Sequence, residues 1–323
     1  MTDARSSDPA DPTDHAAGAA PVKGPFVGAV IALRSEALRD DVETAIALGV
    51  HHVRIAMPWA QAQPKPGMLD GGVVEELRAA AQDVHEAGLQ VWMSLLSPDV
   101  PRWFDSDGGF TDESTARHWW PRWVETAAGA MGDHVDGWVP FEAPFALAER
   151  LVPSDPRRHG QVVDTLLEAW RDAWRILHGP LPIATSLDVK VVAIPRDDVV
   201  AAELARRDEH LRWHTWLRAL RDGTITIPGR ADRELSDLAG SCDQLGIAAS
   251  GSTADDLEPL LHRTAEEGPG RPLAITFRPT GPDRDARGEA VDVVTRRAVE
   301  LARSFPLDRL TFTDLDAVAL TRR

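Results

Sequence analysis

The sequence of 323 residues contains no tyrosine, a single cysteine and no long apolar run. One cysteine, Cys242, excludes an internal disulfide framework and fits a reducing compartment such as the cytoplasm. No stretch reaches the roughly 18 consecutive apolar residues that a membrane-spanning helix needs. The first residues also lack the basic start and apolar run of a secretory signal. We therefore expect a cytoplasmic protein with no membrane partner.

Basic residues are scarce relative to acidic ones. The chain has 35 Lys and Arg against 51 Asp and Glu, which gives a formal net charge of −16 at pH 7. Nucleic acids and anionic lipid surfaces are bound by clustered cations, and the short arginine pairs of this chain have carboxylates beside them. The sequence therefore predicts no nucleic-acid partner.

Eight short apolar runs are present and alternate with longer amphipathic segments. The runs are continuously apolar, which is typical of parallel strands covered on both faces. They span residues 26–33, 51–57, 89–96, 135–141, 181–187, 243–249, 272–277 and 308–313. The predicted helices include residues 35–48, 71–87, 160–178, 197–222, 253–266 and 286–304, and a further helix begins at Thr111 or Asp112 and ends near Met131.

This alternation predicts an α/β fold, a (β/α)8 TIM barrel, as a single domain over residues 25–323. Residues 1–24, rich in Asp, Ala and Pro, are predicted to be a disordered tail. A doubly wound open sheet is the main alternative. It would need a glycine-rich phosphate turn after its first strand, and "ALRSEALRD" offers none.

In a TIM barrel the functional side chains lie at the C-terminal ends of the strands. The residues that follow the apolar runs are Ser35, Glu36, Trp59, Ser97, Asp99, Glu142, Asp188, Ser250, Phe277, Arg278, Asp314 and Asp316. The set is polar and mostly acidic, as a sugar-binding pocket often is, and as any exposed loop rim also is. We expect no cofactor. His210 and His214 are spaced to share a helix face, but their segment reads as an amphipathic helix rather than a metal site.

Five segments, taken in order, resemble glycoside hydrolase family 1, the family of β-glucosidases and β-galactosidases. The most informative is "MGDHVDGWVPFEAPFAL" (131–147), which is similar to the strand that carries the family's threonine-phenylalanine-asparagine-glutamate-proline box. The other four are residues 40–64, 87–110, 240–250 and 270–281. The resemblance covers residues 26–318 and implies the same barrel.

The resemblance also implies retaining hydrolysis, in which one carboxylic acid protonates the leaving oxygen and a second carboxylate attacks the sugar. In this sequence the acid/base position falls on Ala143 and the nucleophile position on Phe277. Neither a methyl group nor a phenyl ring can perform these steps. The catalytic pair of the family is therefore predicted to be absent.

Other family positions are changed as well. Sugar-binding polar or aromatic residues of the family correspond here to Ser35, Ser97, Pro98, Ala248 and Ala249. The positions that still match are Arg54, Trp59, Asp99 and Pro144, and Glu142 replaces the asparagine of the box. The resemblance thus leaves Arg54, Trp59, Asp99, Glu142 and Arg278 as candidate ligand-binding residues.

Glu142 has two interpretations. As a relocated general acid it would need a second carboxylate from Asp99, Asp188, Asp314 or Asp316, placed to within about an ångström. As a structural residue it would pair with Arg54 or Arg278, because an unpaired charge inside the barrel mouth is costly. Arg278 could neutralise the acidic rim or bind an anionic group, and Trp59 could stack on a sugar face.

Three hypotheses about function follow. The favoured one is a glycosidase-like barrel that has lost catalysis and is kept for binding a carbohydrate or another small ligand, or for contacting a protein. The second is an active O-glycosyl hydrolase that uses relocated carboxylates, such as Glu142 with Asp99 or Asp314. The third is a purely structural partner subunit. The tryptophan pairs at helical spacing, such as Trp170 and Trp174, are expected to pack in the core.

Overall fold

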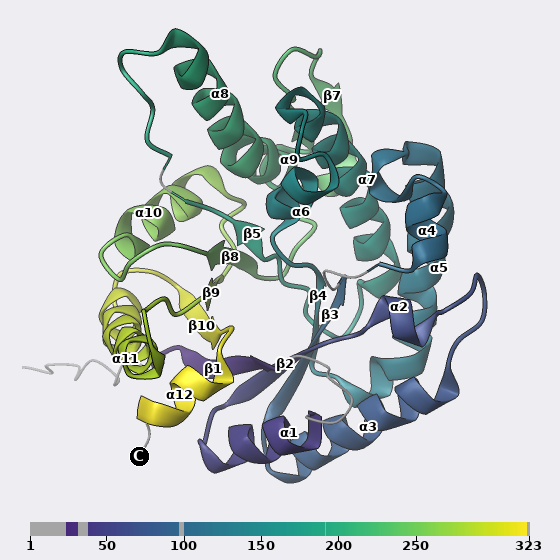
Figure 1. The fold of residues 1–323 in the computed structure, drawn as a ribbon, viewed down its shortest axis with the longest axis vertical. Coiled ribbons are helices and arrows are strands. Elements are labelled where there is room, and N and C mark those ends of the chain that lie inside the picture. The colour runs from purple at the N-terminus through teal and green to yellow at the C-terminus, as the bar shows by residue number, and fades with distance from the viewer. Residues whose placement is uncertain (1–23, 32–37, 97–99, 191, 322–323) are drawn as a thin grey trace, which may run out of the picture.

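The computed structural model describes residues 24–31, 38–96, 100–190 and 192–321, which form a barrel of parallel strands surrounded by helices (Figure 1). The eight strands of the sheet lie in the order β4-β3-β2-β1-β10-β9-β8-β5. They are β1 Phe26–Ile31, β2 His52–Ala56, β3 Gln90–Leu96, β4 Gly137–Phe141, β5 Leu187–Asp188, β8 Leu245–Ala249, β9 Leu273–Phe277 and β10 Leu307–Phe312. Each predicted apolar run supplies one of these strands.

Closure of the barrel depends on the residues just before β5. The N–H of Trp138 donates to the carbonyl of Pro182 at 2.9 Å, and the N–H of Ala184 donates back to Trp138 at 2.8 Å. On the other side, the N–H of Thr185 donates to the carbonyl of Gln244 at 3.1 Å. Residues 182–185 therefore join β4 to β8, and the predicted (β/α)8 barrel is confirmed.

The helices lie outside the sheet, in the places that the sequence predicted. The longer ones are α1 Leu38–Ala47, α3 Gly71–Glu86, α5 Glu113–Met131, α7 His159–Leu177, α8 Val199–Glu209, α9 Thr215–Asp222, α10 Leu257–Glu267 and α11 Arg284–Leu301. The shorter ones are α2 Trp59–Ala62, α4 Arg102–Ser106, α6 Pro144–Leu151 and α12 Leu315–Thr321. Of the two N-caps considered for α5, the structure uses Asp112, whose carboxylate accepts the N–H of Thr115 at 2.8 Å.

One predicted helix, residues 197–222, is helical but not uniform. A π-helical turn, His210–His214, separates α8 from α9. The turn positions the buried guanidinium of Arg212, which contacts the end of β5. After α9 a small hairpin of β6 Thr224–Ile225 and β7 Arg233–Glu234 extends the chain before it re-enters the barrel.

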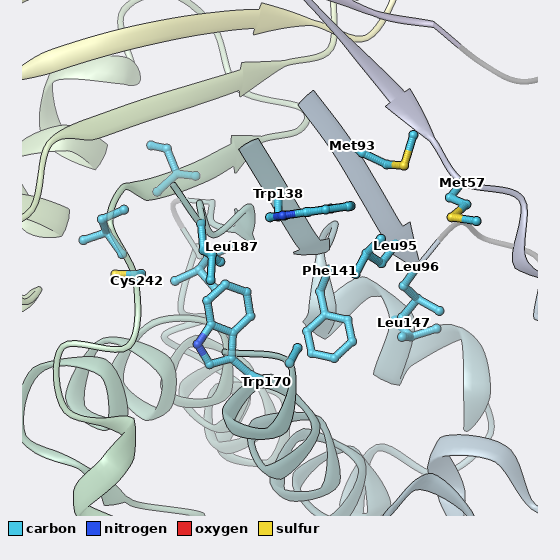
Figure 2. Packing of buried hydrophobic residues seen from close by; sticks show 14 of the residues in the cluster. Met57, Met93, Leu95, Leu96, Trp138, Phe141, Leu147, Trp170, Leu187 and Cys242 are labelled. Atoms are coloured by element: carbon cyan, nitrogen blue, oxygen red, sulfur yellow. The ribbon is translucent and has the colours of Figure 1, made fainter. Parts of the chain in front are cut away.

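Tryptophans pack much of the layer between the sheet and the helices. The fully buried ones are Trp59, Trp120, Trp123, Trp170, Trp213 and Trp216. Figure 2 shows Trp170 beside Phe141, with the ring centroids 6.2 Å apart, so that α7 is packed against the end of β4. The indole N–H of Trp170 donates to the carbonyl of Ser241 at 2.9 Å, which satisfies its polar atom. Cys242 is buried in the same layer, as expected.

The inside of the barrel is unusually polar. His52 contacts the hydroxyl of Thr311 at 2.9 Å, and the guanidinium of Arg309 lies 3.5 Å above the ring of Trp92. Only glycine fits at position 28, because a Cβ there would lie 2.4 Å from the carbonyl oxygen of His52. The interior is thus filled by side chains, as expected of a small barrel.

Substitution of Gly246 tests the closure. A Cβ at this position would lie 2.0 Å from the carbonyl oxygen of Thr185, in backbone that cannot move without opening the junction of β5 and β8. Gly246→Ala should therefore lower the free energy of unfolding by about 3 kcal/mol, measured by urea denaturation. Gly129→Ala, in α5 with nothing within 4 Å of the added methyl, is the control and should be neutral or stabilising. Equal midpoints for wild type and Gly246→Ala would contradict the closure.

Candidate functional site

An open cleft of about 680 Å³ lies beside the mouth of the barrel. It is formed where β1, β9 and β10 end, at the face where TIM barrels bind their ligands. Its lining residues are Val30, Asp41, Arg278, Pro279, Thr280, Gly281, Arg287, Thr313, Asp314, Leu315 and Asp316. The lining is largely polar, so the cleft suits a hydrophilic ligand.

The centre of the mouth holds an ion pair between Arg54 and Glu142. Arg54 projects from β2, is only 4% exposed, and has its Nη1 3.7 Å from Oε1 of Glu142. The same Nη1 donates to the hydroxyl of Thr276 at 3.0 Å. Burial lowers the pKa of Arg54, and the neighbouring carboxylate of Glu142 partly opposes that effect. Of the two pairings considered for Glu142, the structure contains the one with Arg54.

Several polar atoms around this pair are buried without a hydrogen-bond partner. They are Oε1 of Glu142, Nε of Arg54 and the hydroxyl oxygens of Ser94 and Ser186. Alternation along the strands places both serines on the barrel side, because Trp92 and Ala184, two residues earlier, contact each other inside the barrel. Buried polar groups normally have hydrogen-bond partners, so these atoms are suited to hydrogen-bonding with the hydroxyls of a ligand.

Ala143, the acid/base position implied by the resemblance, adopts a left-handed backbone conformation. Its φ is 48°, and it is the sole non-glycine residue with a positive φ in the described part of the chain. The conformation costs about 1–2 kcal/mol for a residue with a Cβ. The N–H of Ala143 donates to the carbonyl of Ser186 at 2.8 Å, and Pro144 begins α6. The turn therefore presents a methyl group where an acid would be needed.

Asp188, at the end of β5, fixes the helix that follows this turn. Its carboxylate accepts the N–H groups of Phe145 and Ala146, both at 2.8 Å, and Nη1 of Arg212 at 2.9 Å. Burial raises the pKa of Asp188 to about 6, although Arg212 and the two N–H groups favour the ionised form. Because all these contacts are structural, Asp188 is not the free second carboxylate that a relocated mechanism requires.

The position implied for the nucleophile, Phe277, does not line the mouth, so this expectation was wrong. Thr276 points toward Arg54 inside the barrel, and the next side chain of the strand must face the helices. Phe277 is 2% exposed and lies edge-on to Phe312, with 6.3 Å between the ring centroids. The inward side chain here is therefore the threonine, one residue earlier. Residues 270–281 contain no carboxylate, so the strand offers no nucleophile in either alignment.

Trp59 is also misplaced by the sequence prediction. It is completely buried, its ring is stacked on Trp123 at 5.3 Å, and Phe104 lies 4.7 Å away. The reason is that α2 begins at Trp59 and turns it toward α4 and α5. With both ring faces covered, Trp59 cannot stack on a sugar. Trp103 is half-buried in the same aromatic cluster and donates its indole N–H to the carbonyl of Gln63.

The remaining candidates are spread around the rim. Arg278 is exposed and lines the cleft. Asp314 accepts Nε of Arg287 and the N–H of Ala317, both at 2.9 Å, so its carboxylate is already engaged. Asp99 lies outside the described residues, as do Ser35, Glu36, Ser97 and Pro98.

Sequence reasoning missed Thr276, Ser94 and Ser186. A usable signal existed, because each is a hydroxyl residue within an otherwise apolar segment, and such residues in barrel strands tend to face a polar interior.

Within the described ranges no group of three or more His, Cys, Asp or Glu could hold a metal ion. Of the histidine pair, His210 has its Nε2 atom hydrogen-bonded to the carbonyl of Thr226. None of the helices that the structure describes is long and apolar enough to cross a membrane.

Comparison with known proteins supports the fold. No family model matches the sequence. The chain is 27% identical over 148 residues to Klotho from Homo sapiens, a match that covers 42% of this chain and 14% of Klotho. The chain thus spans about a seventh of the length of this relative.

Solved structures agree over most of the chain. The family 1 β-glucosidase from Thermotoga maritima superposes with a TM-score of 0.77 at 13% identity, covering 91% of this chain and 88% of that one. The β-glycosidase from Pyrococcus horikoshii gives a TM-score of 0.75 at 15% identity, with 90% and 84% covered. This protein therefore has the fold of the family 1 β-glucosidases, and the predicted fold resemblance is confirmed.

Paired substitutions on β9 test the orientation of the strand. Phe277→Glu would bury an unpaired carboxylate on the helix side and should destabilise the protein by more than about 3 kcal/mol, or prevent folding. Arg278→Glu, one residue further in the cleft, should change stability by less than about 0.5 kcal/mol. Urea denaturation followed by tryptophan fluorescence measures both. A stable Phe277→Glu variant would show that residue 277 faces the mouth.

Asp188 should make stability depend on pH in a defined direction. Its pKa in the folded protein, about 6, lies above its ordinary value of 3.8. Its contribution to stability is therefore fully present below about pH 4 and is lost as the pH rises through 6. The stability of wild type relative to Asp188→Asn should increase from pH 7 to pH 4, by up to about 3 kcal/mol.

The matched control is a second Asp→Asn substitution, at the exposed Asp316, against which the Asp188 difference is compared at each pH. Urea denaturation across this pH range measures both differences. An Asp188 difference that grows with rising pH would mean that attraction to Arg212 outweighs burial.

Proposed function

We propose that the chain is a divergent, cytoplasmic relative of the family 1 glycoside hydrolases that binds a carbohydrate at the mouth of the barrel without cleaving it. The single observation that carries the proposal is the composition of the mouth. In the described part of the mouth the carboxylate of Glu142 is paired with the buried cation Arg54, whereas a retaining enzyme needs two carboxyl groups about 5 Å apart.

The absence of hydrolysis follows from the roles of the nearby groups. Ala143 has no proton to give, and the inward residue of β9 is Thr276. Asp188 and Asp314 are held by arginines and main-chain N–H groups. Glu142 is paired with the buried Arg54, with 3.7 Å between its Oε1 and Nη1 of the guanidinium.

Binding is supported by the polar character of the site. The cleft of about 680 Å³ is large enough for a sugar and is lined mostly by polar side chains. The hydroxyls of Ser94 and Ser186 and the carboxylate of Glu142 do not line this cleft but lie on or beside β3, β5 and β4. They are polar groups without a full set of partners that could hydrogen-bond to the hydroxyls of a sugar reaching the centre of the mouth. The proteins with the same fold are named as β-glucosidases and β-glycosidases, so β-linked glucosides are the first ligands to test.

Two measurements on one preparation test the proposal. Thermal denaturation with a panel of mono- and disaccharides should show a rise in Tm for at least one sugar, because a ligand at a hundred times its Kd stabilises the folded state by about 2.7 kcal/mol. Glu142→Gln should reduce that rise, whereas Glu266→Gln, on the exposed face of α10, should leave it unchanged. If no sugar changes the Tm, the binding function is wrong.

Aryl β-glycosides supply the second measurement. Wild type should release no more aryl alcohol than a heat-inactivated sample. Turnover that disappears in Glu142→Gln would instead establish the alternative function, an active hydrolase with a relocated general acid.

A further inference from the structure

Helix α8 stands at the periphery of the molecule, outside the ring of helices that covers the sheet (Figure 1). Only Ala202 of its eleven residues is buried. α8 continues through the π-helical turn into the well-buried α9, so it is anchored at its C-terminal end while its own surface stays largely outside the core. Something beyond the helix itself is needed to explain the side chains that it exposes.

This region exposes four large apolar side chains close together in the sequence. We refer to Ile194, Val199, Val200 and Leu204 as the α8 face; Val199 is 83% exposed and Val200 is 71% exposed. Val200 and Leu204 are four residues apart and therefore lie on one side of the helix. The other large apolar side chains that are exposed in the described ranges are dispersed over β1, α11 and the loop before α3. Exposed apolar side chains gathered on one segment, unlike dispersed ones, indicate a contact surface.

A groove of about 520 Å³ adjoins the α8 face. Its apolar walls are Pro153, Pro156, Val192, Ala205 and Leu211, and Leu204 belongs to both the groove and the face. The exposed valines Val199 and Val200 thus form an apolar tip that lies near this groove. The groove could receive the corresponding tip of a second molecule. A tip and a recess on the same side of a molecule can fill each other in a pair of copies related by a two-fold axis.

The charges along the helix favour the same arrangement. Asp197 and Asp198 lie at its start, and Arg206 and Arg207 lie toward its end. Asp208 and Glu209, which follow them, pair with Arg212 and Arg263 of the same chain, and the mid-helix Glu203 lies 3.5 Å from Arg206. Arg196 precedes the acidic group. In an antiparallel pair, packing of Leu204 on Val200 of a second copy brings Arg206 level with the acidic start of that copy's helix. A parallel pair would instead place like charges together, which is unfavourable.

We propose that the chain forms a symmetric homodimer in which the two α8 helices pack antiparallel and each Val199–Val200 tip covers the groove of the other copy. The interface is isologous, so it closes at two copies and does not propagate into fibres. The inference is independent of the function proposed for the barrel mouth, because the α8 face and the groove share no residue with that site.

Sedimentation velocity over a hundredfold range of concentration tests the dimer. Wild type should shift from the 35.2 kDa monomer toward twice that mass as the concentration rises. Val200→Asp combined with Leu204→Asp should weaken association at least tenfold without lowering Tm, because both side chains are solvent-exposed in the monomer. Val293→Asp, a partly exposed apolar residue of α11, is the matched control and should dimerise like wild type.

Charge reversal separates the antiparallel arrangement from a nonspecific apolar contact. Arg206→Glu should weaken the dimer several-fold, and the addition of Asp197→Arg should restore it. Circular dichroism checks that α8 remains helical in each variant. Three results would overturn the proposal: a wild type that stays monomeric, which would mean that another occupant covers this face; a dimer that survives the double aspartate substitution; or a lack of rescue by Asp197→Arg.

Discussion

The geometry of the mouth depends on how residues 182–185 join β4 to β8. Five main-chain hydrogen bonds make this junction, and Gly246 is required because nothing larger than hydrogen fits against Thr185. The junction brings the end of β5 beside the end of β4, where Asp188 can bind the first N–H groups of α6. The left-handed turn at Ala143 is then held between β4 and a capped helix. A strained turn persists only when its surroundings over-determine it, and these contacts do so.

The fold could be predicted from the sequence because both of its signals are local. Continuous apolar runs of about strand length separated by amphipathic segments specify a parallel sheet with covered faces, and eight repeats specify a closed barrel. The direction of individual side chains could not be predicted equally well, because a shift of one residue exchanges the two faces of a strand. Phe277 and Thr276 show this directly. Trp59 was misplaced for a different reason, since the short helix that begins there is set by tertiary contacts with α4 and α5.

Ion pairing accounts for why carboxylates are present near the mouth and yet are poorly suited to catalysis. Asp188 and Asp314 each accept both an arginine and a main-chain N–H, and Glu142 lies against the buried Arg54. A carboxylate held in this way is engaged by its structural partners and is not free to attack a substrate. This protein thus combines the fold of the β-glucosidases with carboxylates that are held in ion pairs. A shared fold does not imply a shared activity, because activity depends on the groups at the site.

The central claim, a carbohydrate site that lacks a nucleophile, is tested most directly by trapping. A 2-deoxy-2-fluoro glucosyl fluoride carries a good leaving group but hydrolyses slowly from a carboxylate, so a retaining enzyme accumulates the covalent glycosyl ester. Mass spectrometry of the intact chain after incubation should show the unmodified mass. An added fluoroglucosyl group, mapped by peptide analysis to Glu142, Asp314 or any other carboxylate, would contradict the account.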